Sequence, residues 1–320
     1  MEWYEIVACV FGGIVSLLIL CLLIALVCFF MVFYSAKRKP LTGDDYAFPP
    51  GEEYKPFYPQ MLAWMKDIRY RPHEDVSVRS YDGLTLRGKY YEYSPDAPVE
   101  LLFHGYRGAS ERDLAGGVER CFALGRSALL IDQRGAGTSD GHVITFGIRE
   151  RKDCLTWIEF ATEKFGKDKP LIIGGISMGA ATVLLAAGEA LPDNVKCVMA
   201  DCGYSDAKSI IQKVIRQLHL PVRFFYFFVK LGAKIYGGFD LEEVSPIEAV
   251  QKTSKPIIFI HGDADGFVPC EMSVEMHEAC VSQKKLVIIK GADHGLAYPV
   301  DRDGYVQALA EFWKDCGYSS

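Results

Sequence analysis

The chain has 320 residues, a formal net charge of −6 at pH 7, and a composition in which 50% of the residues are hydrophobic. A chain of this length holds one large domain or two small ones and buries a sizeable core, which argues against a bare peptide-binding module. Its charges are spread without long acidic or basic runs, so the sequence lacks the clustered basic face of a nucleic-acid-binding protein, and we expect no nucleic-acid partner.

An apolar segment begins the chain. No charged residue lies between Glu5 and Lys37, and the middle of this stretch reads FGGIVSLLILCLLIALVCFFMVF. A membrane-spanning helix needs only about 20 apolar residues, and core helices rarely run this long without a polar face. A signal peptide would have a basic start and a small-residue cleavage site, which MEWYE and YSAKRKP do not provide. We predict an uncleaved single-pass anchor in residues 1–36, with a helix from about 6 to 34.

The charges that flank this helix indicate its orientation. Lys37, Arg38 and Lys39 follow it, whereas Glu2 and Glu5 precede it. Because basic residues stay on the cytoplasmic side, we expect the rest of the chain in the cytoplasm. Three of the ten cysteines lie in the anchor and the other seven are scattered without CxxC spacing. This pattern is typical of free thiols in a reducing compartment.

The next segments are a linker and a hairpin. Residues 37–75 are rich in proline and aromatic residues (AFPPGEEYKPFYPQ), with one short helix expected at Tyr58–Tyr70. We interpret them as a linker that packs on the following domain. The runs DVSVRS and LTLRGKYYEY then alternate on either side of Tyr81-Asp82-Gly83, which predicts an antiparallel hairpin.

Residues 76–320 have the pattern of an α/β domain. Short apolar runs alternate with helical stretches, which predicts a mostly parallel sheet covered by helices on both faces. Six such runs occur: VELLFHG, SALLIDQRG, PLIIGGIS, VKCVMADC, PIIFIHGD and KLVIIKGADHG. Each ends in a glycine or a polar residue, so chemically active groups gather at the carboxyl ends of strands, where open α/β sheets place their sites.

An insertion at about 206–254 interrupts this alternation with helical sequence and contains five consecutive aromatic residues, Phe224–Phe228. Five rings in a row point all round a helix, so a single core-facing stripe cannot explain them. We predict a helical cap over the carboxyl edge of the sheet, with these rings lining an apolar pocket. Ordinary cap-to-sheet packing and contact with a bilayer remain alternatives.

The sequence Gly175-Ile176-Ser177-Met178-Gly179 has the context of a nucleophile. It follows the apolar run LIIG and precedes the helical stretch AATVLLAAGEAL. A sharp strand-to-helix turn needs small residues around a nucleophile whose side chain projects alone. The following helix directs its first amide, that of Met178, at negative charge developing beside Ser177. The alternative is a glycine-rich turn with a capping serine.

A serine hydroxyl needs a base within hydrogen-bond reach and a carboxylate that orients the base. The run PIIFI leads into HGDADGFVP, which offers Asp263 and Asp265, and the last apolar run ends at His294. The order Ser177, Asp265, His294 is the order of serine, acid and histidine in α/β-hydrolases.

With these residues the chain resembles the α/β-hydrolase superfamily, in particular its alpha/beta-hydrolase-domain esterases and serine-aminopeptidase-like members. The family pattern HG-x-x-D-x-x-V-P places the acid on Asp265 in preference to Asp263, and a D-H-G pattern places the base on His294. Two further family patterns match, H-G-x-x-G at residues 104–108 and D-x-R-G-x-G-x-S at residues 132–139. The resemblance extends from about residue 76 to the C-terminus.

The resemblance implies roles for further residues. The amide of Tyr106 would be the second oxyanion donor beside that of Met178. His104 would be bonded within its own loop, and residues 132–139 would form a turn scaffold. We expect His261 to turn the strand end and His277 to lie in a helix, whereas three other histidines lack a partner pattern: His73, His142 and His219. No cluster has metal-ligand spacing, so we expect neither a metal nor a cofactor.

Together these features predict a membrane-anchored serine hydrolase that cleaves carboxylic esters or thioesters. The aromatic cap and the anchor favour an apolar acyl group from a lipid or an acylated protein. Two alternatives remain, a serine peptidase or amidase of the same fold and a non-catalytic binding scaffold. The oligomeric state stays open.

Overall fold

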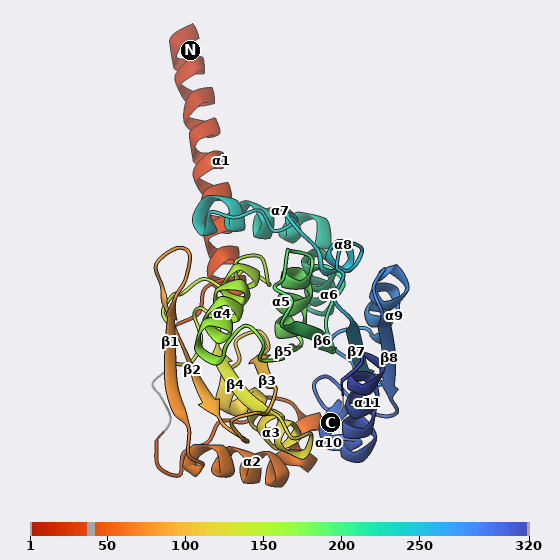
Figure 1. Ribbon diagram of the computed structural model, residues 1–320. Coiled ribbons are helices and arrows are strands. Elements are labelled where there is room, and N and C mark those ends of the chain that lie inside the picture. Colours follow the sequence, from red (N-terminus) through yellow and green to blue (C-terminus); the bar gives the residue numbers. More distant parts are fainter. Residues whose placement is uncertain (1, 37–41, 319–320) are drawn as a thin grey trace.

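The computed structural model describes residues 2–36 and 42–318. Lys37, Arg38 and Lys39, on which the orientation prediction depends, lie outside these ranges. One eight-stranded sheet forms the centre of the molecule, with the strand order β1-β2-β4-β3-β5-β6-β7-β8 (Figure 1). The strands are β1 (Glu74–Arg79), β2 (Thr85–Tyr91), β3 (Val99–Phe103), β4 (Ser127–Asp132), β5 (Leu171–Ile176), β6 (Val195–Asp201), β7 (Ile257–Gly262) and β8 (Lys284–Ile289).

The pairing of the strands confirms the predicted sheet. β1 and β2 form the antiparallel hairpin, and β2 pairs antiparallel with β4. Strands β3 to β8, which are the six apolar runs, are parallel to one another. All residues of β3, β4 and β7 are buried, as expected for strands covered on both faces. The carboxyl ends of these strands therefore share one edge of the sheet.

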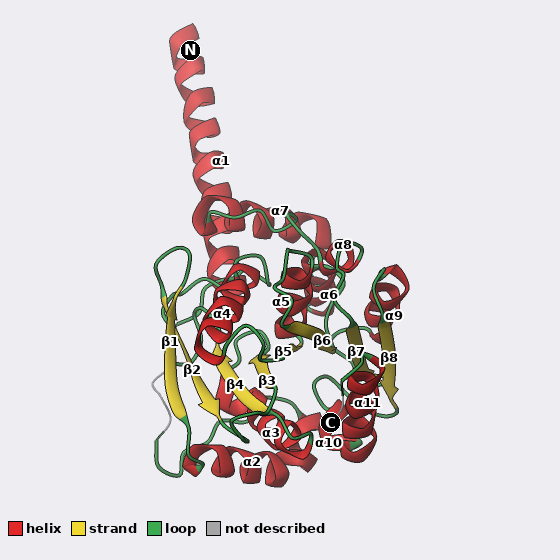
Figure 2. Cartoon of the chain, viewed as in Figure 1, coloured by secondary structure: helices red, strands yellow, loops and turns green. Residues whose placement is uncertain are grey.

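Helices cover both faces of the sheet (Figure 2). One core contains buried residues of α4 (Glu150–Phe165), α5 (Met178–Ala187) and α9 (Cys270–Ala279). The other contains buried residues of α2 (Tyr58–Tyr70), α3 (Ser110–Ala123) and α11 (Arg302–Asp315). A short helix, α10 (Ala297–Val300), precedes α11. This arrangement is a three-layer α/β architecture.

The segment before the hairpin packs on the domain, as expected. A short 3-10 helix, η1 (Glu52–Phe57), leads into α2, which has the predicted bounds Tyr58–Tyr70. Met65 and Ile68 of α2 are buried in the second core. The ring of Trp64 lies so close to Gly116 of α3 that a Cβ atom there would come within 2.9 Å of it.

The insertion between β6 and β7 is helical. It contains α6 (Ala207–Gln217), α7 (Val222–Gly232), the π-helical turn η2 (Ala233–Gly237) and α8 (Pro246–Val250). Asp206 is the N-cap residue of α6, and its side chain accepts a hydrogen bond from the Ser209 amide. The apolar side of α6 contributes buried residues to a third core, which also holds residues of α7. These elements are the predicted cap.

The N-terminal helix α1 (Trp3–Val32) projects from the domain, and its C-terminal part lies against the cap (Figure 1). It starts before the predicted residue 6, because the Glu5 carboxylate accepts a 2.9 Å hydrogen bond from the Glu2 amide and stabilises the first turn. By length and composition α1 could cross a membrane. Its lower part is buried at Ala25 and Phe29, and a Cβ atom on Gly232 of α7 would come within 2.5 Å of the Ala25 carbonyl.

Candidate active site

Ser177 lies in the turn between β5 and α5 with φ 57° and ψ −117°, a backbone conformation that L-residues rarely adopt. Two glycines make this turn possible. A Cβ atom on Gly175 would come within 2.2 Å of the Gly179 backbone, and one on Gly179 within 2.0 Å of the Phe103 carbonyl. The Ser177 amide donates a 2.8 Å hydrogen bond to the carbonyl of Asp201 at the end of β6. The turn is therefore held against both neighbouring strands.

The structure brings Ser177, His294 and Asp265 together. Nε2 of His294 lies 2.9 Å from Oγ of Ser177, and Nδ1 of His294 lies 2.7 Å from Oδ2 of Asp265. The three side chains come from the loops after β5, β7 and β8, so the parallel sheet explains how residues distant in sequence meet. The imidazole bridges a hydroxyl and a carboxylate, which is the geometry of a serine, histidine and acid triad.

Asp265 is held as an anion that accepts hydrogen bonds at both oxygens. Oδ1 accepts from the backbone amides of Phe267 and Val268, at 2.8 and 2.7 Å. Burial raises the pKa of this carboxyl, but hydrogen bonds with His261 and His294 outweigh burial and hold the pKa well below its usual range. The carboxylate can therefore fix the orientation of the His294 ring.

His261 has a role that we did not predict from the sequence. Instead of only turning the end of β7, its buried ring contacts the acid, with Nε2 3.1 Å from Oδ2 of Asp265 and 3.0 Å from the Val268 carbonyl. Both neighbours are acceptors, so Nε2 bears the proton, and Nδ1 accepts from the Ser273 hydroxyl at 2.6 Å. The four-residue spacing from His261 to Asp265 in HGDAD was the signal that could have indicated this contact.

The competing carboxylate, Asp263, has a different environment. Its Oδ1 accepts a 2.6 Å hydrogen bond from the Gly291 amide, which ties the loop after β7 to the end of β8. Asp293, beside His294, accepts bonds from the Gly266 and His294 amides. Both carboxylates therefore shape the loops, and Asp265 is the one in contact with the His294 ring.

The loop after β3 lies beside Ser177. A Cβ atom on Gly105 would come within 3.5 Å of the Ser177 Cβ. His104 is bonded within this region, because its Nδ1 lies 2.8 Å from the Gly105 carbonyl and its Nε2 accepts a 3.0 Å bond from the Gln133 amide. This agrees with the expected structural role. Tyr106 follows in the loop and Met178 begins α5, and their assignment as oxyanion donors remains a prediction.

The turn that follows β4 is a scaffold around Asp132. One carboxylate oxygen accepts a 3.0 Å bond from the Ser110 amide, and the other accepts a 2.9 Å bond from the Thr138 amide. The Asp132 carbonyl accepts a 2.6 Å bond from the Ser139 hydroxyl. These bonds fix the start of α3 and the end of β4 in one arrangement.

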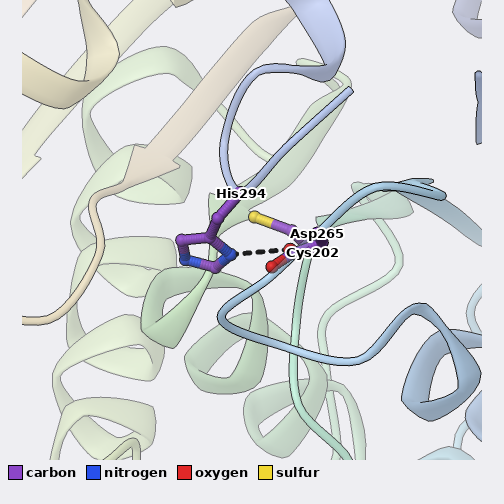
Figure 3. Close-up of side chains that lie close together, drawn as sticks. All are labelled: Cys202, Asp265 and His294. Carbon is purple, nitrogen blue, oxygen red and sulfur yellow. Dashed lines mark hydrogen bonds and ion pairs between the residues drawn. The ribbon is translucent and has the colours of Figure 1, made fainter. Parts of the chain in front are cut away.

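Cys202, the last residue of the run VKCVMADC, also lies close to Asp265 and His294, although it was not a predicted site residue (Figure 3). Possible ligand atoms of Cys202, Asp265 and His294 all lie within 4.8 Å of one another, a spacing that could hold a metal ion. Metal binding would need a thiolate, but burial raises the pKa of the Cys202 thiol well above its ordinary value. The ring and the carboxylate are also hydrogen-bonded to each other. The donor set therefore suits proton transfer better than metal coordination.

An apolar cavity of about 690 Å³ opens beside Ser177. Its walls come from the cap and, unexpectedly, from α1. The lining residues from the cap and the sheet edge include Phe146, Tyr204, Ile211, Ile215 and Phe225.

The expected lining by the aromatic block is largely wrong, because only Phe225 among the five reaches this cavity. Tyr226 and Phe228 are buried in the cap, and Phe224 and Phe227 are 50% and 60% exposed. Successive side chains of a helix point in different directions, so the five rings lie all round α7 and one of them, Phe225, faces the cavity.

Family models match most of the domain. The α/β hydrolase fold family matches residues 101–242, and the dienelactone hydrolase family matches residues 227–316. The first match contains Ser177 and the second contains Asp265 and His294.

Comparisons with individual proteins agree with this. The chain is 29% identical to the Bacillus subtilis protein YqkD, over 59% of this chain and 62% of that protein, less than two thirds of its length. It is 27% identical to the Schizosaccharomyces pombe protein bem46, over 83% of this chain and 82% of that protein. The structure of the Pyrococcus furiosus esterase Pf2001 superposes with a TM-score of 0.65 at 20% identity, over 88% of this chain and 98% of that one. The chain is a member of the α/β-hydrolase superfamily.

Proposed function

We propose that the protein is a membrane-anchored serine hydrolase that cleaves carboxylic esters or thioesters through an acyl-enzyme on Ser177. The observation that supports this best is the chain of hydrogen bonds from Ser177 through His294 to Asp265, at 2.9 and 2.7 Å. A base in contact with both a hydroxyl and a buried carboxylate is the arrangement that activates a serine.

The mechanism follows from this geometry. Oγ of Ser177 attacks the substrate carbonyl while Nε2 of His294 takes the hydroxyl proton. The amides of Met178 and Tyr106 stabilise the oxyanion, and the ionised Asp265 stabilises the imidazolium. His294 then protonates the leaving group. Water repeats the same steps on the acyl-enzyme and releases the acid.

The cavity favours an apolar acyl group. Its walls are mainly aliphatic and aromatic side chains, and it reaches Ser177 directly. Burial of hydrocarbon contributes about 0.8 kcal/mol per methylene group, so such walls select for long or bulky acyl chains. A peptide substrate would place amide groups against these walls without hydrogen-bond partners, which is costly. Esters and thioesters are therefore the preferred substrates.

The nucleophile can be tested on the whole chain in detergent. We expect a fluorophosphonate probe to label the wild type covalently and p-nitrophenyl esters to be hydrolysed. Ser177→Ala should abolish labelling and lower kcat by on the order of 10⁶.

Ser77→Ala, at an exposed position of β1, is the matched control and should behave as the wild type. Full labelling or turnover in folded Ser177→Ala protein would refute the proposal. Membrane anchoring is checked separately, by whether the protein stays with the membrane fraction in alkaline carbonate.

A further inference from the structure

We propose that α1 is a wall of the acyl-binding site as well as an anchor, and that a long acyl chain of the substrate lies along it and enters from the membrane side. This inference rests on the proposed function, and it adds where the acyl chain binds. It predicts that residues of the N-terminal helix determine acyl-chain selectivity.

One face of α1 lines the cavity that reaches Ser177. Leu23, Val27 and Met31 are spaced four residues apart and share this face, and Ile24 and Cys28 extend it. The opposite side, at Ala25 and Phe29, is buried against the cap. The C-terminal part of α1 therefore has two distinct apolar faces, one packed against the cap and one facing the cavity.

The cavity is open along α1. Leu23, Val27 and Met31 line it, yet they are 53%, 57% and 62% exposed. The rest of the helix above them is also apolar and exposed, with Ile19 and Leu20 each 53% exposed. A hydrocarbon chain could pass from a bilayer around the upper part of α1 into the cavity and stay in apolar surroundings along the way.

Three polar side chains of the cavity walls have protein partners. The Tyr106 hydroxyl donates to the Val32 carbonyl at 2.6 Å, and the Tyr204 hydroxyl donates to the Phe146 carbonyl at 3.0 Å. Arg107 donates to the carbonyls of Met31 and Tyr34, at 2.8 and 3.0 Å. Away from Ser177 the walls thus present mainly hydrocarbon, which fits an acyl chain better than a polar ligand.

The same bonds fix the position of α1. Tyr106 and Arg107 belong to the loop beside Ser177, and both bind carbonyls at the C-terminal end of the helix. A flexible tether would have no such bonds to the site. These bonds therefore hold α1 at a defined distance from Ser177. A fixed distance is needed if α1 is to select substrates by the length of their acyl chain.

A matched pair of substitutions tests the inference. Leu23→Trp places a larger side chain on the cavity face. Leu18→Trp makes the same change at a residue of α1 that does not line the cavity and is 58% exposed. The measurement is the ratio of kcat/KM for p-nitrophenyl laurate to that for p-nitrophenyl acetate, with the full-length protein in detergent. Excluding about two methylene groups should lower this ratio roughly tenfold in Leu23→Trp.

Leu18→Trp should keep the wild-type ratio, and Val27→Trp should repeat the loss. The same ratio in the wild type, Leu23→Trp and Val27→Trp, with all three active, would overturn the inference and leave the proposed function intact. A wild type that hydrolyses neither ester and does not react with a fluorophosphonate would refute the proposed function and this inference with it.

Discussion

The Tyr106 hydroxyl donates a 2.6 Å hydrogen bond to the backbone carbonyl of Val32, the last residue of α1. This bond joins the loop beside Ser177 to the helix that we propose as the anchor. The helix end has no further turn to satisfy its carbonyls, so a side chain from the site supplies the donor. We therefore expect the position of α1 and the shape of the site to be coupled.

Removing this bond tests the coupling. Tyr106→Phe keeps the ring and the backbone amide but leaves the Val32 carbonyl without this donor. A hydrogen bond contributes about 1 kcal/mol, so we expect a small loss of thermal stability and a several-fold lower kcat/KM for long-chain esters. Tyr70→Phe, at a residue that is 71% exposed, is the control. Equal behaviour of the two variants would show that the bond is irrelevant.

The two neighbouring carboxylates of the β7 loop should differ sharply in catalysis. Asp265→Asn removes the acceptor that orients Nδ1 of His294, and we expect kcat to fall by about 10⁴ through loss of the correct tautomer. Asp263→Asn changes a loop contact with Gly291, and kcat should stay within several-fold of the wild type. Steady-state kinetics of both purified variants decides. The reverse order of effects would transfer the acid role to Asp263.

The low pKa of Asp265 predicts a pH dependence of stability. In the unfolded chain the pKa of an aspartate is about 3.9. In the folded protein burial raises the pKa of Asp265, but hydrogen bonds with His261 and His294 outweigh burial and hold this pKa lower. The ionised carboxylate thus stabilises the fold above the unfolded pKa, and this contribution is lost as pH falls through the folded pKa.

The measurement is the urea midpoint of the wild type and of Asp265→Asn at pH 7 and pH 3. The advantage of the wild type should be larger at pH 7 and should shrink at pH 3. A gap that widens on acidification would mean that the folded-state pKa is raised and not lowered.

A buried ionic cluster at the start of β3 should be important for stability. Glu100 is fully buried and pairs with Arg120 and with Arg126, the latter at 3.0 Å. Glu100→Gln leaves two buried guanidinium groups without their counter-ion, and we expect a loss of about 3–5 kcal/mol in the free energy of unfolding. Glu311→Gln breaks an exposed pair with Lys285 and should cost much less. Urea unfolding of both variants provides the comparison, and equal losses would contradict this view of the cluster.

Much of the fold and the candidate site could be predicted from the sequence. Each residue of the proposed triad lies in the loop that follows a short apolar run, and the carboxyl ends of parallel strands meet at one edge, so local patterns placed Ser177 and His294 at the same edge of the sheet. The choice of Asp265 over Asp263 came from the family resemblance. The glycines of the turn also indicated the site, because their presence reflects a local steric requirement: Gly179 has no room for a Cβ atom beside the Phe103 carbonyl.

The rest depends on contacts between segments that no local pattern links. The α1 wall could not be predicted, because Leu23 and Val27 look the same in sequence whether they face lipid or a cavity. The aromatic block misled for a similar reason, since composition does not tell which of the five rings lines the cavity, and only Phe225 does. Cys202 ends the run VKCVMADC, so the sequence did place it at this edge of the sheet. Its contact with Asp265 depends on the pairing of β6 with β7, which the sequence did not show.

The most direct test of the central claim is detection of the acyl-enzyme itself. Full-length protein in detergent is mixed with excess p-nitrophenyl laurate, quenched in acid within the first turnovers, digested and analysed by mass spectrometry. We predict a lauroyl group on the peptide that contains Ser177, formed in the wild type and absent in His294→Ala. Ester hydrolysis that proceeds at the wild-type rate with the acyl group on another residue, or that is unaffected by His294→Ala, would contradict the account.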